Sequence, residues 1–165
     1  MGTAKIVSTS EIAAAQSFRH DQGSAGTTQR AERYRQIVNH FEQVARANVG
    51  TFVQVADLSR IAEINQRTLS RAFREIRGMG PYRYVQCLRL IEVRRILLSE
   101  GKGTVTQAAM RFGFREVGKF GVLYRKAFGE APSETRRRRQ SVSPHDTPLV
   151  PNETEEIAPC VRIRL

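Results

Sequence analysis

Apolar side chains recur with a helical period along most of this chain, and that period constrains the fold more than any other feature. Between residues 28 and 139 they fall three or four positions apart, and no segment shows the strict alternation of a half-buried strand. The first series runs from Tyr34 to Ala45, with Thr27 and Thr28 as candidate helix caps and an end near residues 48–50. The pattern predicts an all-α protein.

A short helix, a tight turn and a longer helix follow this first helix. The short helix is predicted over residues 55–62, and the turn at Glu63-Ile64. Asn65 is suited to cap the longer helix, predicted over residues 66–77, because its side chain can accept a hydrogen bond from an amide of the first turn.

The next predicted helix is apolar on more than one side. It begins at Pro81, a residue suited to the first turn of a helix, and ends near residue 99. Gly78, just before it, is suited to the left-handed position that ends the preceding helix. A helix so broadly apolar is expected to be buried against two neighbours and to connect two packed units. Cys87, on this helix, is expected to be a small packing residue.

The same arrangement then returns about 50 residues later. Thr104 is expected to cap a short helix over residues 105–112, Gly113 to make the turn, and residues 116–128 to form a longer helix. Residues 132–139 are predicted as a final short helix that ends in four consecutive arginines. The chain therefore contains two copies of the series short helix, turn, longer helix.

These elements predict three regions and their subdivisions. They are a flexible N-terminal segment or linker (1–27), a bipartite helical domain (28–139, with a first unit at about 53–77, a linker helix at about 81–99 and a second unit at about 104–128), and a disordered C-terminal tail (140–165).

Positive charge is concentrated in the helical region. The chain has a net charge of +11, and residues 28–139 contain 23 Lys and Arg against 10 Asp and Glu. Such an excess favours a polyanionic partner, because lysine and arginine that neutralise phosphates release condensed counterions. Charge alone leaves duplex DNA, RNA and an anionic membrane surface as candidate partners.

Several other classes of protein are disfavoured by the sequence. No apolar run approaches the roughly 20 residues that a bilayer requires, and no secretory signal pattern is present, so we expect a cytoplasmic protein without a membrane partner. The two cysteines and three histidines lack metal-site spacing. No arrangement typical of a nucleophile, an acid–base pair or a phosphate-binding glycine loop is found, so we expect no enzymatic activity and no cofactor.

A short helix joined to a longer one by a tight turn is typical of the helix-turn-helix, whose second helix enters the DNA major groove. An ordinary helical bundle is the alternative. The predicted outer side of residues 66–77 favours DNA, because arginine can pair with guanine, glutamine with adenine, and serine with phosphates. That side carries Gln66, Arg67, Ser70, Arg71 and Arg74, with Glu75 as its one acid.

These features resemble the C-terminal DNA-binding domain of the AraC/XylS family of transcription regulators. The resemblance spans about residues 28–138 and is carried by Gly113-Phe114, Phe120, Tyr124, Phe128-Gly129, Pro132 to Arg136, Leu69, Arg71, Phe73, Gly78-Met79, Pro81 and Leu88-Arg89-Leu90. It implies a seven-helix, homeodomain-like domain in which a central helix joins two helix-turn-helix subdomains. It also implies double-stranded promoter DNA as the partner, with the two recognition helices in adjacent major grooves, and RNA polymerase as a second candidate partner.

The resemblance also implies which side chains contact DNA. The family's base-contacting positions correspond to Gln66, Arg67, Ser70 and Arg71 in the first unit, and to Gly118, Lys119 and Val122 in the second. Our hypothesis is that the first unit contacts bases while the second mostly grips phosphates. The expected phosphate ligands are Arg74, Arg115, Lys119, Arg125, Lys126, Arg136 and Arg137.

The sequence departs from the family pattern at four positions. Gly118 replaces a hydroxyl residue, Val122 stands where arginine is common, Gly121 adds a second helix-weakening residue, and Glu63 stands where the first turn usually has glycine. We expect no small-molecule ligand within these residues, which form either a C-terminal piece of a longer regulator or a stand-alone module. An RNA-binding module is disfavoured because the aromatic residues fall at core spacings instead of being free to stack on bases. A basic helical adaptor that binds a partner protein is the remaining alternative.

Overall fold

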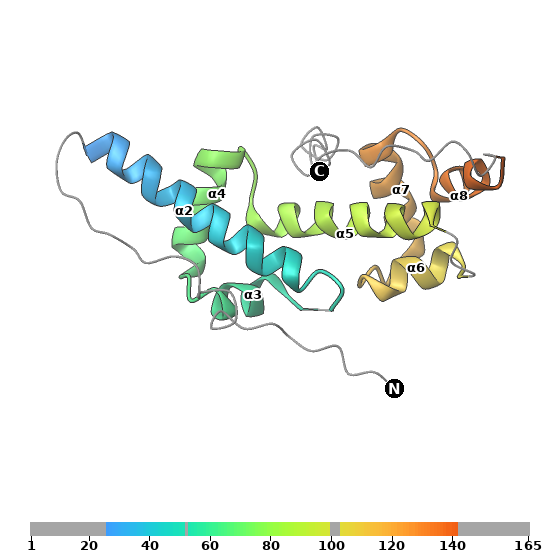
Figure 1. Cartoon of the computed structure of the whole chain (residues 1–165), viewed down its shortest axis with the longest axis horizontal. Helices are drawn as coiled ribbons and strands as arrows, with labels where there is room; N and C mark the ends of the chain where they lie inside the picture. Colours follow the sequence, from blue (N-terminus) through green and yellow to red (C-terminus); the bar gives the residue numbers. More distant parts are fainter. Residues whose placement is uncertain (1–25, 52, 100–102, 142–165) are drawn as a thin grey trace. The chain divides into compact units, whose positions relative to one another are not determined.

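The computed structural model describes residues 26–51, 53–99 and 103–141, and within these ranges all regular structure is helical (Figure 1). The predicted all-α class and the seven helices are confirmed. The helices are α2 (Gly26–Ala47), α3 (Val55–Ile61), α4 (Gln66–Arg77), α5 (Pro81–Leu98), α6 (Val105–Arg111), α7 (Val117–Phe128) and α8 (Pro132–Ser141). They divide into two compact units, one ending at Val85 and the other beginning at Gln86, so the division falls within α5.

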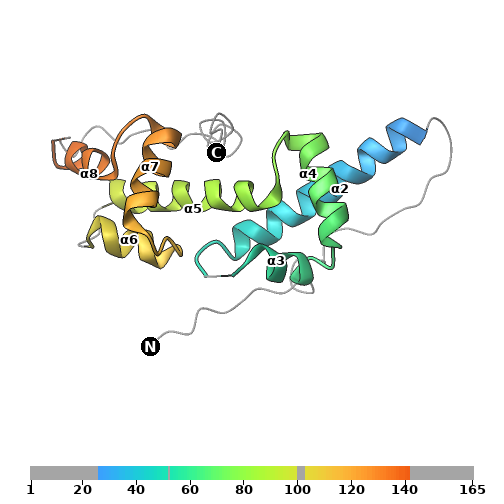
Figure 2. The ribbon, with the colours of Figure 1, turned by 180° about the vertical axis from the view of Figure 1, so that it is seen from behind.

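In the first unit, α2 packs across α3 and α4, as both ribbon views show (Figures 1 and 2). The core is built on aromatic rings that are almost completely buried. The ring of Phe73 lies edge-on to Phe41, with 5.4 Å between centroids, and the same distance separates it from Tyr84. Burial of such rings dominates the stability of a small helical unit. This core fixes which side of α4 faces inward.

In the second unit, α6 and α7 pack with the C-terminal part of α5 around one core. Buried side chains from α5, including Cys87 and Leu90, meet Ala109 of α6 with Phe120 and Tyr124 of α7. The packing role predicted for Cys87 is therefore confirmed.

Side-chain caps and left-handed residues set where these helices begin and end. The Asn65 side chain accepts a hydrogen bond from the amide of Arg67 at 2.9 Å, and Gly78 ends α4 with φ of 65°. Thr104 and Gln107 form a reciprocal capping box at the start of α6. Both caps were expected, and α4 has the predicted bounds.

The two turns between helices share one hydrogen-bonding pattern. The amide of Ile64 donates to the carbonyl of Ser59 at 2.9 Å, and the amide of Phe114 donates to that of Ala109 at 3.0 Å. This is the closing bond of a Schellman motif, which needs a left-handed residue just before the donor. In the second unit that residue is Gly113, with φ of 83°; in the first it is Glu63, with φ of 56°. Glu63 therefore has a left-handed backbone conformation, which is unfavourable for a residue with a β-carbon.

The two units resemble each other more closely than the sequence pattern indicated. Both α4 and α7 have 12 residues, end on a left-handed glycine and are followed by a helix that begins with proline. Equivalent positions lie 51 residues apart, from Gln66 to Val117 and from Pro81 to Pro132. Each residue of α4 therefore has a defined counterpart in α7.

Two predicted boundaries were wrong by two residues or more. Thr27 and Thr28 do not cap α2, since this helix already begins at Gly26, before the apolar pattern starts. An exposed ion pair joins Arg30, near this end of α2, to Glu75 of α4 at 2.8 Å, and apolar periodicity cannot reveal such a contact. The helix α8 continues to Ser141, two residues into the predicted tail. The rest of the predicted terminal segments lies outside the described residues.

None of the described helices has the combination of length and apolar character that a membrane span requires.

Candidate nucleic-acid interface

The outer face of α4 presents polar and basic side chains opposite its buried face. Leu69, Ala72 and Phe73 are completely buried and fix the orientation of the helix. The predicted base-contacting set lies on the other side: Gln66, Arg67 and Arg71 are exposed, Ser70 is half-buried, and the predicted phosphate ligand Arg74 is exposed. The structure therefore brings together all five predicted residues of the first unit.

The arginines of this face are not engaged by acidic side chains in the described part of the chain. Among the residues that the structure describes, Arg67, Arg71 and Arg74 have no ion-pair partner. The one acid beside them, Glu75, is paired with Arg30 of α2 at 2.8 Å. This hydrogen bond raises the pKa of Arg30. The face keeps its positive charge while its acid is neutralised.

A partly buried ion pair anchors the C-terminal end of α4 on α2. Arg77 donates from Nε to Oε1 of Glu42 at 2.7 Å and from its terminal nitrogen to Oε2 at 2.8 Å. This bidentate geometry is the strongest form of such a pair, and the hydrogen bond raises the pKa of Arg77. Tyr84 lies in the same environment, and burial raises its pKa to about 12. The helix α4 is thus held by charge as well as by core packing.

The outer face of α7 differs in kind from that of α4. The residues equivalent to Arg67, Ser70 and Arg71 are Gly118, Gly121 and Val122, and the Val122 side chain is 58% exposed. The glycines leave the helix backbone uncovered on this side.

Basic side chains lie around that apolar centre. Lys119 and Lys126 are seven residues apart and so share one flank, while Arg125 projects from the last turn, and all three are exposed. Lys119 forms an ion pair with Glu116 at 2.8 Å, which holds the ammonium group at the start of α7. Arg115, just before the helix, is also exposed. This pattern is compatible with the predicted phosphate-binding role of the second unit.

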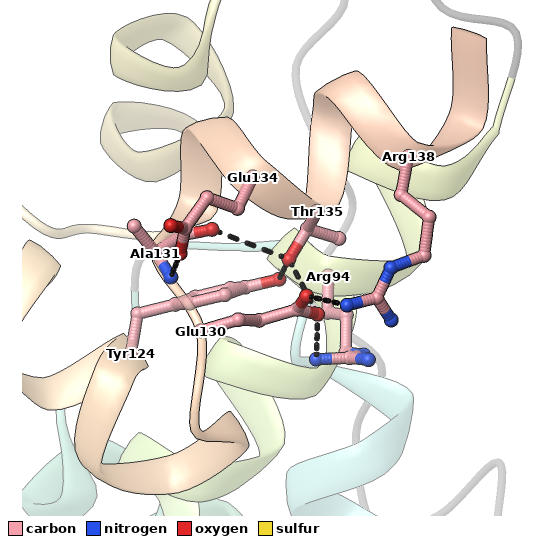
Figure 3. A network of polar contacts seen from close by, with 7 residues as sticks. All are labelled: Arg94, Tyr124, Glu130, Ala131, Glu134, Thr135 and Arg138. Carbon is pink, nitrogen blue, oxygen red and sulfur yellow. Dashed lines mark hydrogen bonds and ion pairs between the residues drawn. The ribbon is translucent and has the colours of Figure 1, made fainter. Parts of the chain in front are cut away.

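A polar network connects α5, α7 and α8 through the buried carboxylate of Glu130 (Figure 3). The Tyr124 hydroxyl donates to Oγ1 of Thr135 at 2.9 Å, and that hydroxyl donates to Oε1 of Glu130 at 2.8 Å. Arg94 approaches the same oxygen at 2.9 Å, and Arg138 pairs with the other oxygen. Burial raises the pKa of Tyr124, so its hydroxyl remains a donor. The network fixes α8 beside the second recognition helix.

Because of this network, the arginines of α8 differ in how accessible they are. Arg138 is bound to Glu130, whereas Arg137 is exposed and Arg136 is half-buried. Of the two phosphate ligands predicted on α8, Arg137 is thus the more accessible.

Sequence patterns missed the residues that position the two recognition helices. Glu42, Arg77, Arg94 and Glu130 carry no motif, and their partners lie up to 36 residues away in the chain, as between Arg94 and Glu130. The one signal in the sequence was an acidic residue, Glu130, directly after Gly129. At the equivalent position, after Gly78, the sequence has the apolar residue Met79.

The chain matches known regulators in sequence. A family model described as a helix-turn-helix domain matches residues 58–138. The chain is 35% identical over 106 residues to XylDLEGF operon transcriptional activator 3 of Pseudomonas putida, covering 61% of this chain and 32% of that protein. It is 33% identical over 93 residues to the transcriptional activator RhaS of Escherichia fergusonii, covering 54% and 33%. The chain therefore spans about a third of the length of these curated relatives.

Solved structures agree with the fold. A probable AraC family transcriptional regulator from Rhodopseudomonas palustris is 32% identical, with a TM-score of 0.59 over 63% of this chain and 97% of that one. The DNA-binding domain of AdpA, solved in complex with a target DNA, has the same fold at 23% identity, with a TM-score of 0.57 over 66% and 97%. With these matches and the two helix-turn-helix units, the chain belongs to the AraC/XylS family of transcription regulators and contains that family's DNA-binding domain.

Proposed function

We propose that this chain binds promoter DNA sequence-specifically, with α4 and α7 as recognition helices in adjacent major grooves and α4 making most of the contacts to bases. The observation that carries the proposal is the outer face of α4, where three exposed arginines have no ion-pair partner among the described residues. Arginine and glutamine on such a face can form bidentate hydrogen bonds with guanine and adenine, each worth about 1–3 kcal/mol of discrimination.

The length of α5 is compatible with this arrangement. Its 18 residues span about 27 Å at 1.5 Å per residue, against roughly 34 Å between successive major-groove faces. The relatives named above are transcriptional activators. We extend activation to this chain, with RNA polymerase as the second partner and the bacterial cytoplasm as the place of action.

The test is a selection of bound duplexes from a random pool, followed by titration of the selected site against scrambled duplex and single-stranded RNA at physiological salt. We expect a defined site bound at least about a thousandfold more tightly than scrambled duplex. Equal affinity for all three nucleic acids would overturn the proposal. Preference for RNA would favour an RNA-binding module. If the chain bound neither DNA nor RNA, a helical adaptor that binds a partner protein would be favoured.

Two variants then separate base contacts from phosphate contacts. Arg71→Ala should change which bases are preferred at one or two positions of the site. Lys126→Ala should weaken all duplexes alike and reduce the slope of log affinity against log salt by about 1. Arg35→Ala is the matched control, since it removes an exposed arginine that is paired with Glu32 on α2. It should change neither property.

A further inference from the structure

The outer face of α7 contains two glycines that the protein's own structure does not require. Neither Gly118 nor Gly121 has a left-handed backbone, and a β-carbon added at either would have no atom within 4 Å. Glycine weakens an exposed helix relative to alanine, so both positions reduce the stability of α7 without a packing reason. Glycine at such positions is typical of a helix backbone that a ligand approaches closely from outside.

Two exposed valines make the outer face of α7 partly apolar. Val122 is 58% exposed and Val117 is 40% exposed, although both stand on a helix whose opposite side buries Phe120 and Tyr124. At the equivalent positions α4 carries Arg71 and Gln66. The second helix thus offers methyl groups and bare backbone where the first offers hydrogen-bond donors.

The charge around this apolar centre favours DNA over a protein as the occupant. Lys119, Arg125 and Lys126 are exposed on the same helix. A partner with an apolar centre and an anionic border complements such a surface. In the major groove the C5-methyl of thymine is the apolar group on the base edges, and phosphates border the groove on both sides.

We propose that α7 recognises thymine C5-methyl groups, with Val122 packing on a methyl and the glycines allowing the helix backbone to come close to the base edges. This inference rests on the proposed function and adds the chemistry of the second half-site. That half-site would be selected by thymines at fixed positions, and the first by hydrogen bonds to guanine and adenine.

The direct test replaces thymine by deoxyuridine, which removes only the methyl group. Each thymine in the half-site contacted by α7 is replaced in turn within the selected duplex. We expect at least one replacement to weaken binding about fourfold, the effect of one buried methyl-sized group. Val122→Ala should weaken binding to the thymine duplex and should abolish its preference over the deoxyuridine duplex. A deoxyuridine replacement in the other half-site is the control, and it should affect both proteins equally.

Gly121→Ala provides an independent test with effects of opposite sign. The added β-carbon should raise the melting temperature, because it meets no atom in the protein and favours the helix. It should also weaken binding to the second half-site, because it moves the backbone away from the bases. A purely structural role for this position would change stability and binding in the same direction.

The inference is overturned if no deoxyuridine replacement in the second half-site changes affinity while the selected site retains fixed bases there. It is also overturned if Val122→Ala leaves DNA affinity unchanged but reduces transcription, since the apolar face would then bind a protein. In both cases the proposed function stands. Absence of any selected site would instead refute the proposed function, and the inference with it.

Discussion

Replacing Glu63 with glycine should stabilise the first unit. With φ of 56°, this residue occupies the left-handed region, which costs an ordinary L-residue roughly 1–2 kcal/mol. Glycine avoids this cost but has more freedom in the unfolded chain, which offsets about 0.4–1 kcal/mol of the gain. We therefore expect Glu63→Gly to raise the free energy of unfolding by about 0.5–1 kcal/mol.

The equivalent turn of the second unit supplies the converse experiment. Gly113 has φ of 83° and closes the same Schellman motif. Gly113→Glu should therefore lower the free energy of unfolding by about 0.5–1 kcal/mol. The two turns have the same hydrogen-bonding pattern. The two substitutions together therefore separate the effect of the backbone conformation from the effect of the surrounding contacts.

Urea denaturation of the full chain at 25 °C measures both effects, and thermal melting should show a rise of roughly 3–6 °C for Glu63→Gly. Glu63→Gln is the control, because it removes the charge but keeps the β-carbon in the left-handed region. If Glu63→Gln stabilises the protein as much as Glu63→Gly, the cause is the negative charge of Glu63 beside the C-terminal end of α3, where the helix dipole is also negative. A fall in stability for Glu63→Gly would refute the strain argument outright.

Three further predictions concern charge and titration. Arg137→Ala should reduce the salt dependence of DNA binding by about one unit of slope, whereas Arg138→Ala, whose guanidinium is bound to a carboxylate, should reduce it by much less; equal effects would contradict the separation of these arginines. Arg77→Ala should lower the free energy of unfolding by about 1–2 kcal/mol, because it leaves the carboxylate of Glu42 without its ion-pair partner; a neutral result in urea denaturation would show that water replaces the pair. Since burial raises the pKa of Tyr84 to about 12, stability should be complete below pH 10 and should fall as the pH rises from 10 to 12. Tyr84→Phe should flatten that decline, and an equally steep decline in this variant would rule Tyr84 out as its cause.

Much of the fold could be predicted because its signals are local. The cap at Asn65, the left-handed Gly78 and the proline at the start of α5 act on their own neighbours, and they defined α4 with its observed bounds. The start of α2 could not be predicted in this way. Its first turn carries no apolar residue, and the ion pair that Arg30 makes with Glu75, 45 residues away in the chain, has no signal at the start of α2.

In the candidate interface, too, the residues set by local patterns could be predicted and those that depend on distant partners could not. The outer residues of α4 were predictable, because a helix that buries Leu69 and Phe73 must expose Arg67 and Arg71. The residues that hold the helix in place were not predictable, since an ion pair such as that between Arg77 and Glu42 has no fixed sequence spacing. Nor did sequence reveal that Gly118 and Gly121 lack a packing role, which requires knowledge of the surrounding atoms.

The 51-residue repeat shows where the two units differ most. Phe73 and Tyr84 of the first unit correspond to Tyr124 and Thr135 of the second, and Met79 corresponds to Glu130. In the first unit the rings of Phe73 and Tyr84 lie 5.4 Å apart. The second unit uses the same backbone positions for a chain of hydrogen bonds.

That exchange could not have been made at a single position. A hydroxyl on buried Tyr124 requires an acceptor, and Thr135 provides one while leaving room for the ring. The Thr135 proton then requires the carboxylate of Glu130, and a buried carboxylate requires the compensating charges of Arg94 and Arg138. Because each group satisfies the next, removing one member leaves a neighbouring polar group with one partner fewer, which weakens the attachment of α8 beside α7.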